Sequence, residues 1–231
     1  MNLNTDIVSL LAAEGCHIVG FADLCPLPRE VRQDFPYGIA IGLPLTGAAM
    51  AANSQDSPAL YYEEYEGLNR ELGRLATLTA SYLVDRGYKA LAKTKPTIVE
   101  TPDHRTLLPH KTVATRAGLG WIGKCAVLVT AAAGSALRLI AVLTDAPLAP
   151  GTPVTASRCP ARCTLCIDVC PGHAPNGRQW SVGVPREEFF DAEACRTAAR
   201  ARAKDLLDIE ETFCGLCISV CPFTKRALGY R

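Results

Sequence analysis

The last third of the chain contains the run Cys159-Pro-Ala-Arg-Cys163-Thr-Leu-Cys166-Ile-Asp-Val-Cys170-Pro171, followed by Cys195 and then by Cys214-Gly-Leu-Cys217-Ile-Ser-Val-Cys221-Pro222. Bacterial two-cluster ferredoxins use the pattern C-x2-C-x2-C-x3-C-P, whose fourth cysteine binds the other cluster. Because each cubane needs four thiolates, these eight cysteines predict two [4Fe–4S] clusters. The chain is therefore expected to carry electrons.

The ligand pattern of two-cluster ferredoxins divides the eight thiolates into two sets of four. One set is expected to be Cys159, Cys163, Cys166 and Cys221, and the other Cys170, Cys195, Cys214 and Cys217. The first gap has three residues where ferredoxins have two, so the loop after Cys159 should bulge. Cys195 lies far upstream of its partners, which requires an intervening helix to fold back.

Zinc is the alternative metal, because two sites of four thiolates would use the same eight cysteines. Zinc knuckles usually consist of C-x2-C pairs without the Cys-Pro ending, so the pattern favours iron–sulfur clusters. The cysteines that remain, Cys16, Cys25 and Cys125, are expected to be free and buried.

The composition argues against several classes of protein. The 231 residues are 48% hydrophobic with a net charge of +1, and they contain no apolar run long enough to span a membrane. The amino-terminal sequence resembles an amphipathic helix and not a signal peptide, so the eleven cysteines suit a reducing cytoplasm better than a secreted disulfide scaffold. No stripe of basic residues indicates nucleic-acid binding.

Hydrophobic periodicity predicts an α/β arrangement ahead of the cysteine runs. The expected elements are helices over residues 5–14, 58–86 and 110–117, strands over 17–22 and 37–43, and a strand pair over 126–130 and 137–143. Residues 146–153 are rich in proline and indicate a linker. We therefore expect an α/β domain over residues 1–150 and a ferredoxin-like double-cluster module over 151–231, with helices near 186–207 and 209–216.

A glycine-rich segment, Gly118-Leu-Gly120-Trp-Ile-Gly123-Lys124, fits the phosphate-binding pattern G-x-x-x-x-G-K. A P-loop also needs Ser or Thr next, where this chain has Cys125, and it needs a strand before it and a helix after it. The expected order here is the reverse, so nucleotide hydrolysis is disfavoured. The glycines instead indicate that the backbone approaches a flat or bulky group, with Arg116 and Lys124 available for its negative charges.

Residues 109–124, Pro-His-Lys-Thr-Val-Ala-Thr-Arg-Ala-Gly-Leu-Gly-Trp-Ile-Gly-Lys, resemble the A-x-x-A-G-[LI]-G-W-x-G-K segment of epoxyqueuosine reductases. The continuation at Gly134-Ser135 and at residues 142–148 is similar too. So is the order of parts: an opening strand, a long helix, this segment and a two-cluster module. The resemblance covers nearly the whole chain, although the sequence ends ten residues after Cys221, before the family's helical-repeat region that helps to hold tRNA.

The resemblance implies a corrinoid, cobalamin, in the first domain, reduced through the two clusters for a reductive reaction. No D-x-H-x-x-G motif surrounds any of the four histidines, so a base-off corrinoid is expected. The residues implied as its contacts are Arg116, Gly118, Gly120, Trp121, Gly123 and Lys124. An external low-potential electron donor would supply the clusters.

The family also places an acidic proton donor upstream of the glycine-rich segment, and that position falls near His104 here. Asp103, His104 and His110 are therefore the candidate proton donors, each weighed against a surface loop without chemistry. The substrate is left open, with a modified tRNA or a corrinoid partner protein as candidates. The competing functions are an electron-transfer or corrinoid-reducing protein without an organic substrate of its own, and a plain ferredoxin fused to a non-catalytic domain.

Overall fold

The computed structural model describes residues 2–98 and 101–230, which form two compact units. The first unit consists of Met1–Leu43, Leu68–Gly120 and Arg138–Val154. The second consists of Pro44–Gly67, Trp121–Leu137 and Thr155–Arg231. The second unit thus contains the cysteine runs together with two segments from the region predicted as the first domain.

The first unit is built on a four-stranded sheet with the order β1-β2-β6-β3. Strands β1 (Ile18–Asp23) and β2 (Tyr37–Pro44) are antiparallel, with Gly20 opposite Ala40. Strands β3 (Ala90–Ala92) and β6 (Leu137–Thr144) are also antiparallel. The central strand β6 is largely buried, as its apolar sequence predicts.

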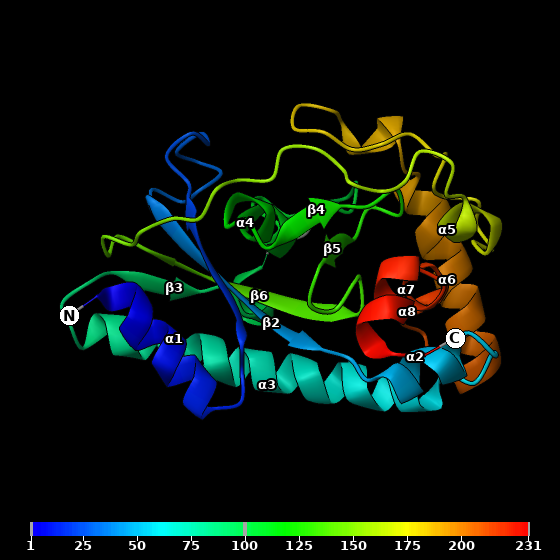
Figure 1. Cartoon of the computed structure of the whole chain (residues 1–231), viewed down its shortest axis with the longest axis horizontal. Coiled ribbons are helices and arrows are strands. Elements are labelled where there is room, and N and C mark those ends of the chain that lie inside the picture. Colours follow the sequence, from blue (N-terminus) through cyan, green and yellow to red (C-terminus); the bar gives the residue numbers. More distant parts are fainter. Residues whose placement is uncertain (1, 99–100, 231) are drawn as a thin grey trace. The chain divides into compact units, whose positions relative to one another are not determined.

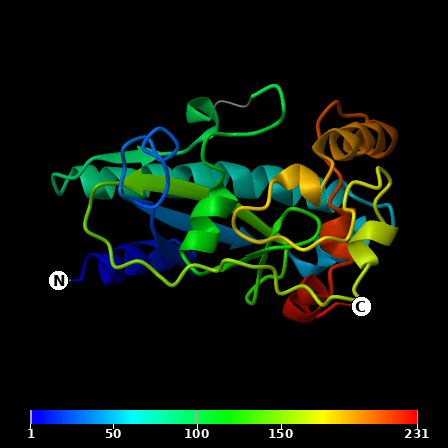
Figure 2. The same ribbon diagram turned by 90° about the horizontal axis from the view of Figure 1, so that it is seen from above.

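The two faces of this sheet carry different side chains because strand residues alternate in direction. Ile39, Ile41 and Leu43 of β2 join a core with apolar residues of α1 (Leu3–Ala13) and of the carboxyl-terminal part of α3 (Ala59–Val84). Figures 1 and 2 show these helices on one face of the sheet and α4 (His110–Arg116) on the other. The predicted helices at these three places are confirmed.

Glycines let α4 and the residues after it approach the second face closely. A Cβ on Gly20 would lie 2.8 Å from Leu119 Cγ and 2.9 Å from Ala117 Cβ. A Cβ on Gly38 would lie 2.8 Å from Val113 Cγ1 of α4. The small residues of β1 and β2 therefore determine how near the helix can pack.

The second unit contains short elements around the cysteine runs. They are α2 (Gly47–Asn53), the first residues of α3, the two-stranded sheet of β4 (Gly120–Ile122) and β5 (Leu128–Thr130), α5 (Leu165–Asp168), α6 (Ala192–Leu207), α7 (Leu216–Ser219) and α8 (Pro222–Leu228). Two 3-10 turns, η1 (Lys95–Thr97) and η2 (Arg186–Glu188), complete the described elements, η1 in the first unit and η2 in the second. Pro222 occupies the first turn of α8, where its missing N–H costs no hydrogen bond within the helix.

Two expectations about secondary structure are wrong. Residues 126–130 and 137–143 do not pair with each other, because Thr130 and Gly134 close a tight turn, β5 pairs with β4, and β6 joins the main sheet. Residues 209–215 are not helical, because Gly215 takes a left-handed conformation with φ 74° just before α7. The stretch 186–207 divides into η2 and α6, whose N-cap Asp191 accepts a hydrogen bond from Ala194 N at 2.9 Å.

Across residues 2–98 and 101–230, none of the helices combines the length and the apolar character needed to cross a membrane.

Substitutions of two glycines should change stability in opposite directions. Gly20→Ala should lower the free energy of unfolding by about 1–3 kcal/mol, because the new Cβ overlaps Ala117 and Leu119. Gly73→Ala in α3 meets nothing within 4 Å and should raise it by about 1 kcal/mol through helix propensity. Urea unfolding of both variants measures the difference, and equal shifts would contradict this packing.

Candidate functional site

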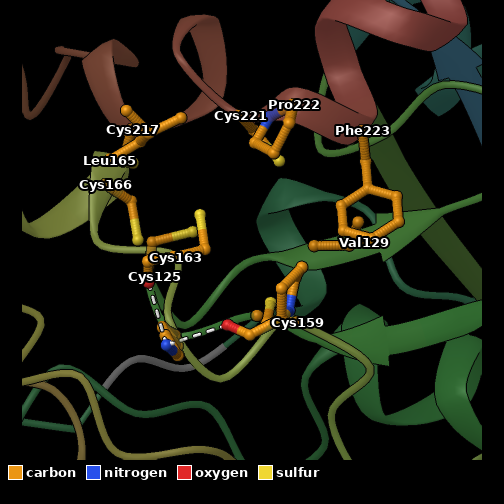
Figure 3. Close-up of a pocket in the computed structure, with 13 residues that line it drawn as sticks. Cys125, Val129, Cys159, Cys163, Leu165, Cys166, Cys217, Cys221, Pro222 and Phe223 are labelled. Atoms are coloured by element: carbon orange, nitrogen blue, oxygen red, sulfur yellow. Dashed lines mark hydrogen bonds between the residues drawn. The ribbon is translucent and has the colours of Figure 1, made fainter.

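Cysteines from both runs surround one cavity in the second unit (Figure 3). Its sulfur-bearing residues are Cys125, Cys159, Cys163, Cys166, Cys217 and Cys221. Val129, Leu165 and Phe223 add apolar walls, and the space, counted with its open mouth, is about 390 Å³. The structure thus brings three cysteines of the first run together with the last cysteine of the second run.

The cysteines of the two runs reach the cavity from three short helices and one loop. Cys166 lies in α5, Cys217 in α7, and Cys221 is the N-cap of α8. Cys159 and Cys163 lie in the loop before α5, where Cys163 N donates to Pro160 O at 3.1 Å. Short helices and turns are what closely spaced cysteines need in order to face one space.

The ammonium group of Lys124 holds this loop in place. Its Nζ donates hydrogen bonds to Ala161 O and Cys163 O at 2.9 Å and to Pro160 O at 3.2 Å. Lys124 is only 3% exposed, so its charge is neutralised by these carbonyl dipoles and not by water. A residue predicted to meet a negatively charged cofactor therefore uses all three of its donors on the chain itself.

A second group of cysteines consists of Cys170, Cys195 and Cys214. Burial, together with the neighbouring thiols of Cys170 and Cys214, raises the pKa of Cys195 to about 11. Ala174 N donates to Cys170 Sγ at 3.4 Å. Cys195 lies in the first turn of α6, and this helix fills the interval before Cys214, as the spacing required.

Arg202 of α6 donates a hydrogen bond to a backbone carbonyl of the second cysteine run, as Lys124 does in the first run. Its guanidinium donates to Cys214 O at 3.4 Å, to Asn53 O and Oδ1, and to Asp56 Oδ1 at 3.0 Å. Asn53 is fully buried and donates to Ser219 Oγ at 2.9 Å. These bonds tie α2, α6 and α7 around the Cys214–Cys217 loop.

Aromatic packing fixes the start of the same loop. Phe213 contacts Tyr61 with ring centroids 4.5 Å apart, and contacts Tyr62 and Tyr65 edge-on. A Cβ on Gly215 would lie 2.3 Å from Tyr61 Cε1, so only glycine fits between Cys214 and Cys217. Tyr61 is therefore a core residue, whereas Tyr62 and Tyr65 are half-buried.

Cys125, which the cysteine spacing leaves outside both predicted ligand sets, also lines the cavity. It is 5% exposed and lies in the turn between β4 and β5, where Gly123 N donates to Val127 O at 2.9 Å. The hydrogen bond to Cys125 raises the pKa of Cys166, and burial adds to it. The signal was present in the sequence, because Cys125 directly follows Lys124. Cys16 is buried as expected, whereas Cys25 is exposed, so that expectation is wrong for Cys25.

Within the described ranges, no three His, Cys, Asp or Glu side chains are drawn together closely enough to hold a single metal ion.

The glycine-rich segment passes from the first unit to the second between Gly120 and Trp121. In the first unit, Arg116 Nε donates to Asp23 O at 2.6 Å, and a Cβ on Gly118 would lie 2.7 Å from Thr152 O. In the second unit, Trp121 is 6% exposed and packs edge-on against Phe223 at 5.0 Å. Its buried indole Nε1 has no hydrogen-bond partner among the described residues.

The three proton-donor candidates all lie in the first unit but differ in state. Hydrogen bonds from Thr101 and Arg105 lower the pKa of Asp103, which is therefore an ionised carboxylate. Burial, together with the charges of Lys93 and Arg138, lowers the pKa of His110 to about 4. His104 lies in a tight turn with φ 57°, and its N donates to Thr101 O at 2.9 Å. At neutral pH, Asp103 is ionised and His110 is a neutral imidazole, so neither side chain carries an acidic proton to donate.

Comparison of the sequence with known proteins identifies epoxyqueuosine reductases as relatives. The chain is 28% identical to the epoxyqueuosine reductase of Pseudomonas aeruginosa over 199 residues, which are 79% of this chain and 49% of that protein. It is 31% identical to the epoxyqueuosine reductase of a Synechococcus species over 171 residues, which are 70% of this chain and 46% of that protein. The predicted resemblance to epoxyqueuosine reductases is confirmed. The chain spans about half the length of these curated relatives, and no family model matches it.

Solved structures show that the fold is shared with epoxyqueuosine reductases. The chain matches an epoxyqueuosine reductase crystallised with a modified tRNA-Tyr stem loop, with a TM-score of 0.64, 17% identity, and coverage of 96% of this chain and 65% of that one. It also matches a reductive dehalogenase described as B12-dependent, with a TM-score of 0.63, 19% identity, and coverage of 94% of this chain and 31% of that one. The mixed α/β fold is the part of the predicted fold class that these matches confirm.

Removing the Lys124 ammonium should destabilise the cysteine loop. Lys124→Met leaves three carbonyls without their donor and should lower the free energy of unfolding by about 3 kcal/mol. Lys204→Met is the matched control, because Lys204 is 54% exposed and pairs only with Asp208, so it should change stability by less than about 0.5 kcal/mol. Chemical denaturation under anaerobic conditions measures both, and equal effects would contradict the role of Lys124.

His110 should make the protein less stable in mild acid. Because its folded pKa of about 4 lies below the ordinary 6.5, the unfolded chain takes up the proton first. This contribution to stability is complete above pH 6.5 and falls as the pH drops toward 4, by about 2 kcal/mol between pH 7 and pH 5. Unfolding measured at both values should show a smaller loss for His110→Gln, whereas His17→Gln, at an exposed position, should behave as the unchanged chain.

Proposed function

We propose that this protein is a corrinoid- and iron–sulfur-dependent reductase similar to epoxyqueuosine reductases. One observation carries the proposal: Cys159, Cys163 and Cys166 share a cavity with Cys221 of the second run. Interleaving of this kind is how two-cluster ferredoxins divide their ligands. The relatives named epoxyqueuosine reductase support the same class of reaction.

The residues present fit two cubane clusters. One cluster would be held by Cys159, Cys163, Cys166 and Cys221, which line the cavity. The other would be held by Cys170, Cys195, Cys214 and Cys217, of which Cys217 also lines that cavity, and all eight cysteines lie within the second unit. The thiols must lose their protons on binding iron, so assembly should release protons to solvent. Lys124 and Arg202 hold the carbonyls of the two loops, which keeps the thiols directed at their clusters.

The residues of the glycine-rich segment fit a corrinoid less completely. Trp121 gives the best support, because its buried indole N–H has no partner among residues 2–98 and 101–230, and a side-chain amide of cobalamin could accept from it. Arg116 and Gly118 are held by their own chain, and Lys124 has no free donor. Gly120 and Gly123 remain proposed backbone contacts. When bound, base-off, the corrinoid would supply the reductive chemistry, with the clusters as its source of electrons.

A proton donor for the reaction is proposed at His104. His104 lies in the turn between Thr101 and Arg105, next to Asp103 in the sequence, and the Asp103 carboxylate is bonded to Arg105 Nε and Thr101 Oγ1. The neutral state of His110 and the ionised state of Asp103 argue against these two groups as acids at pH 7. Histidine is a common general acid in enzymes.

The proposed substrate is a modified tRNA, since a relative of this fold has been crystallised with an epoxyqueuosine-modified tRNA stem loop. The electrons would come from an external low-potential donor in a reducing cytoplasm. The second candidate function is a protein that reduces a corrinoid for a partner protein without an organic substrate of its own. The ionised Asp103 and neutral His110 favour that candidate, because they leave a single side chain to protonate a substrate.

Anaerobic reconstitution with iron and sulfide tests the proposal. The chain should bind about eight iron atoms and show a cubane spectrum, and added cob(II)alamin should give a base-off electron paramagnetic resonance signal. Turnover of an epoxyqueuosine-containing tRNA stem loop would then separate the reductase from the corrinoid-reducing protein. About two zinc ions per chain and no iron would overturn both candidates.

A ligand substitution gives the matched comparison. Cys163→Ala should lose one cluster, so that iron falls to about four atoms per chain. Cys25→Ala, at an exposed cysteine outside the cavity, should keep about eight. Iron analysis of the two purified variants measures this difference.

A further inference from the structure

We propose that Cys125 and Cys159 are alternative thiolate ligands of the same iron in the cluster of the cysteine cavity. The inference rests on the proposed function, because it requires a cluster at this place. It adds a ninth ligand residue to the eight that the cysteine spacing identifies.

The cavity contains more thiols than one cubane can use. Its six cysteines include the four proposed ligands of the first cluster and Cys217, which the ferredoxin ligand pattern assigns to the second cluster. Cys125 is therefore the surplus thiol. It is not a distant free cysteine, because its side chain lines the same space as the proposed ligands (Figure 3).

The two sulfurs reach the same part of the cavity wall. A Cβ built on Gly123 would lie 3.6 Å from Cys159 Sγ and 3.7 Å from Cys125 Sγ. Because Gly123 has no side chain, both sulfurs have access to the space above it. An iron atom near that point can be approached from either side.

The two cysteines differ in burial and in the loop that carries them. Cys125 is 5% exposed in a closed turn, where Ala126 N donates to Gly123 O at 2.9 Å. Cys159 belongs to the loop that has one residue more than a ferredoxin loop, and it is half-buried. The extra residue changes the spacing at Cys159, and Cys125 Sγ lies beside the space that the Cys159 sulfur faces.

The exchange needs no oxidant or reductant. The Fe–S bond to Cys159 breaks as the Fe–S bond to Cys125 forms, and the cluster keeps its electrons. The proton of the Cys125 thiol leaves, and the released Cys159 sulfur takes up a proton, so the net charge is unchanged. Thiolates are the ligands that iron–sulfur clusters accept, and both groups supply one.

Single and double substitutions test the proposal by iron content. Cys159→Ala and Cys125→Ala should each retain about eight iron atoms per chain after anaerobic reconstitution, whereas the double variant should retain about four. Electron paramagnetic resonance of the reduced protein should show two interacting clusters in the single variants and one isolated cluster in the double variant.

Controls separate the possible failures. The double variant Cys25→Ala with Cys159→Ala should keep about eight iron atoms, because Cys25 lies outside the cavity. Cys125→Ser replaces Cys125→Ala if the smaller side chain prevents folding. A Cys159→Ala variant with as little iron as the Cys125/Cys159 double variant overturns the exchange alone. An unsubstituted chain that binds no iron overturns the proposed function, and this inference with it.

Discussion

The second unit depends on a buried ammonium group that is bonded to three backbone carbonyls. Lys124 follows the short strand β4, and its Nζ donates hydrogen bonds to Pro160 O, Ala161 O and Cys163 O at distances of 3.2 Å or less. A buried charge without partners costs several kcal/mol, so the loop and the lysine must form together. This requirement places Cys159 and Cys163 beside the β4–β5 turn, and that turn carries Cys125 into the same cavity.

The second cysteine loop meets the same physical need by different means. Loops that present several thiols to one space have little regular structure, so their carbonyls need donors from elsewhere. Arg202 supplies one to Cys214 O, while Phe213 and Gly215 pack against tyrosines at the start of α3. Lys124 therefore holds the backbone of the first cysteine loop, and Arg202 together with Gly215 holds the backbone of the second.

Prediction from the sequence succeeded where short-range patterns decide the structure. The sequence alone predicts the end of α3 before Gly87 and the apolar strands β1, β2 and β6. Each of these features depends on residues that are close together in the sequence. Pairing of β5 with β6 was wrong because strand partners depend on residues far away in the chain. The state of the proton-donor candidates was also out of reach, since the burial of His110 and the hydrogen bonds of Asp103 arise only in the folded chain.

The sequence by itself determined the chemistry that this protein offers: eight cysteines with ferredoxin spacing, and the Gly118–Lys124 segment that resembles epoxyqueuosine reductases. Spacing has this power because ligand geometry permits few separations between consecutive thiolates. Only the tertiary structure decided that Lys124 binds its own chain, that the Trp121 N–H finds no partner in the described part of the chain, and that Cys125 joins the cavity. Those outcomes depend on contacts between segments that are far apart in the sequence, and the spacing of residues along the chain does not specify such contacts.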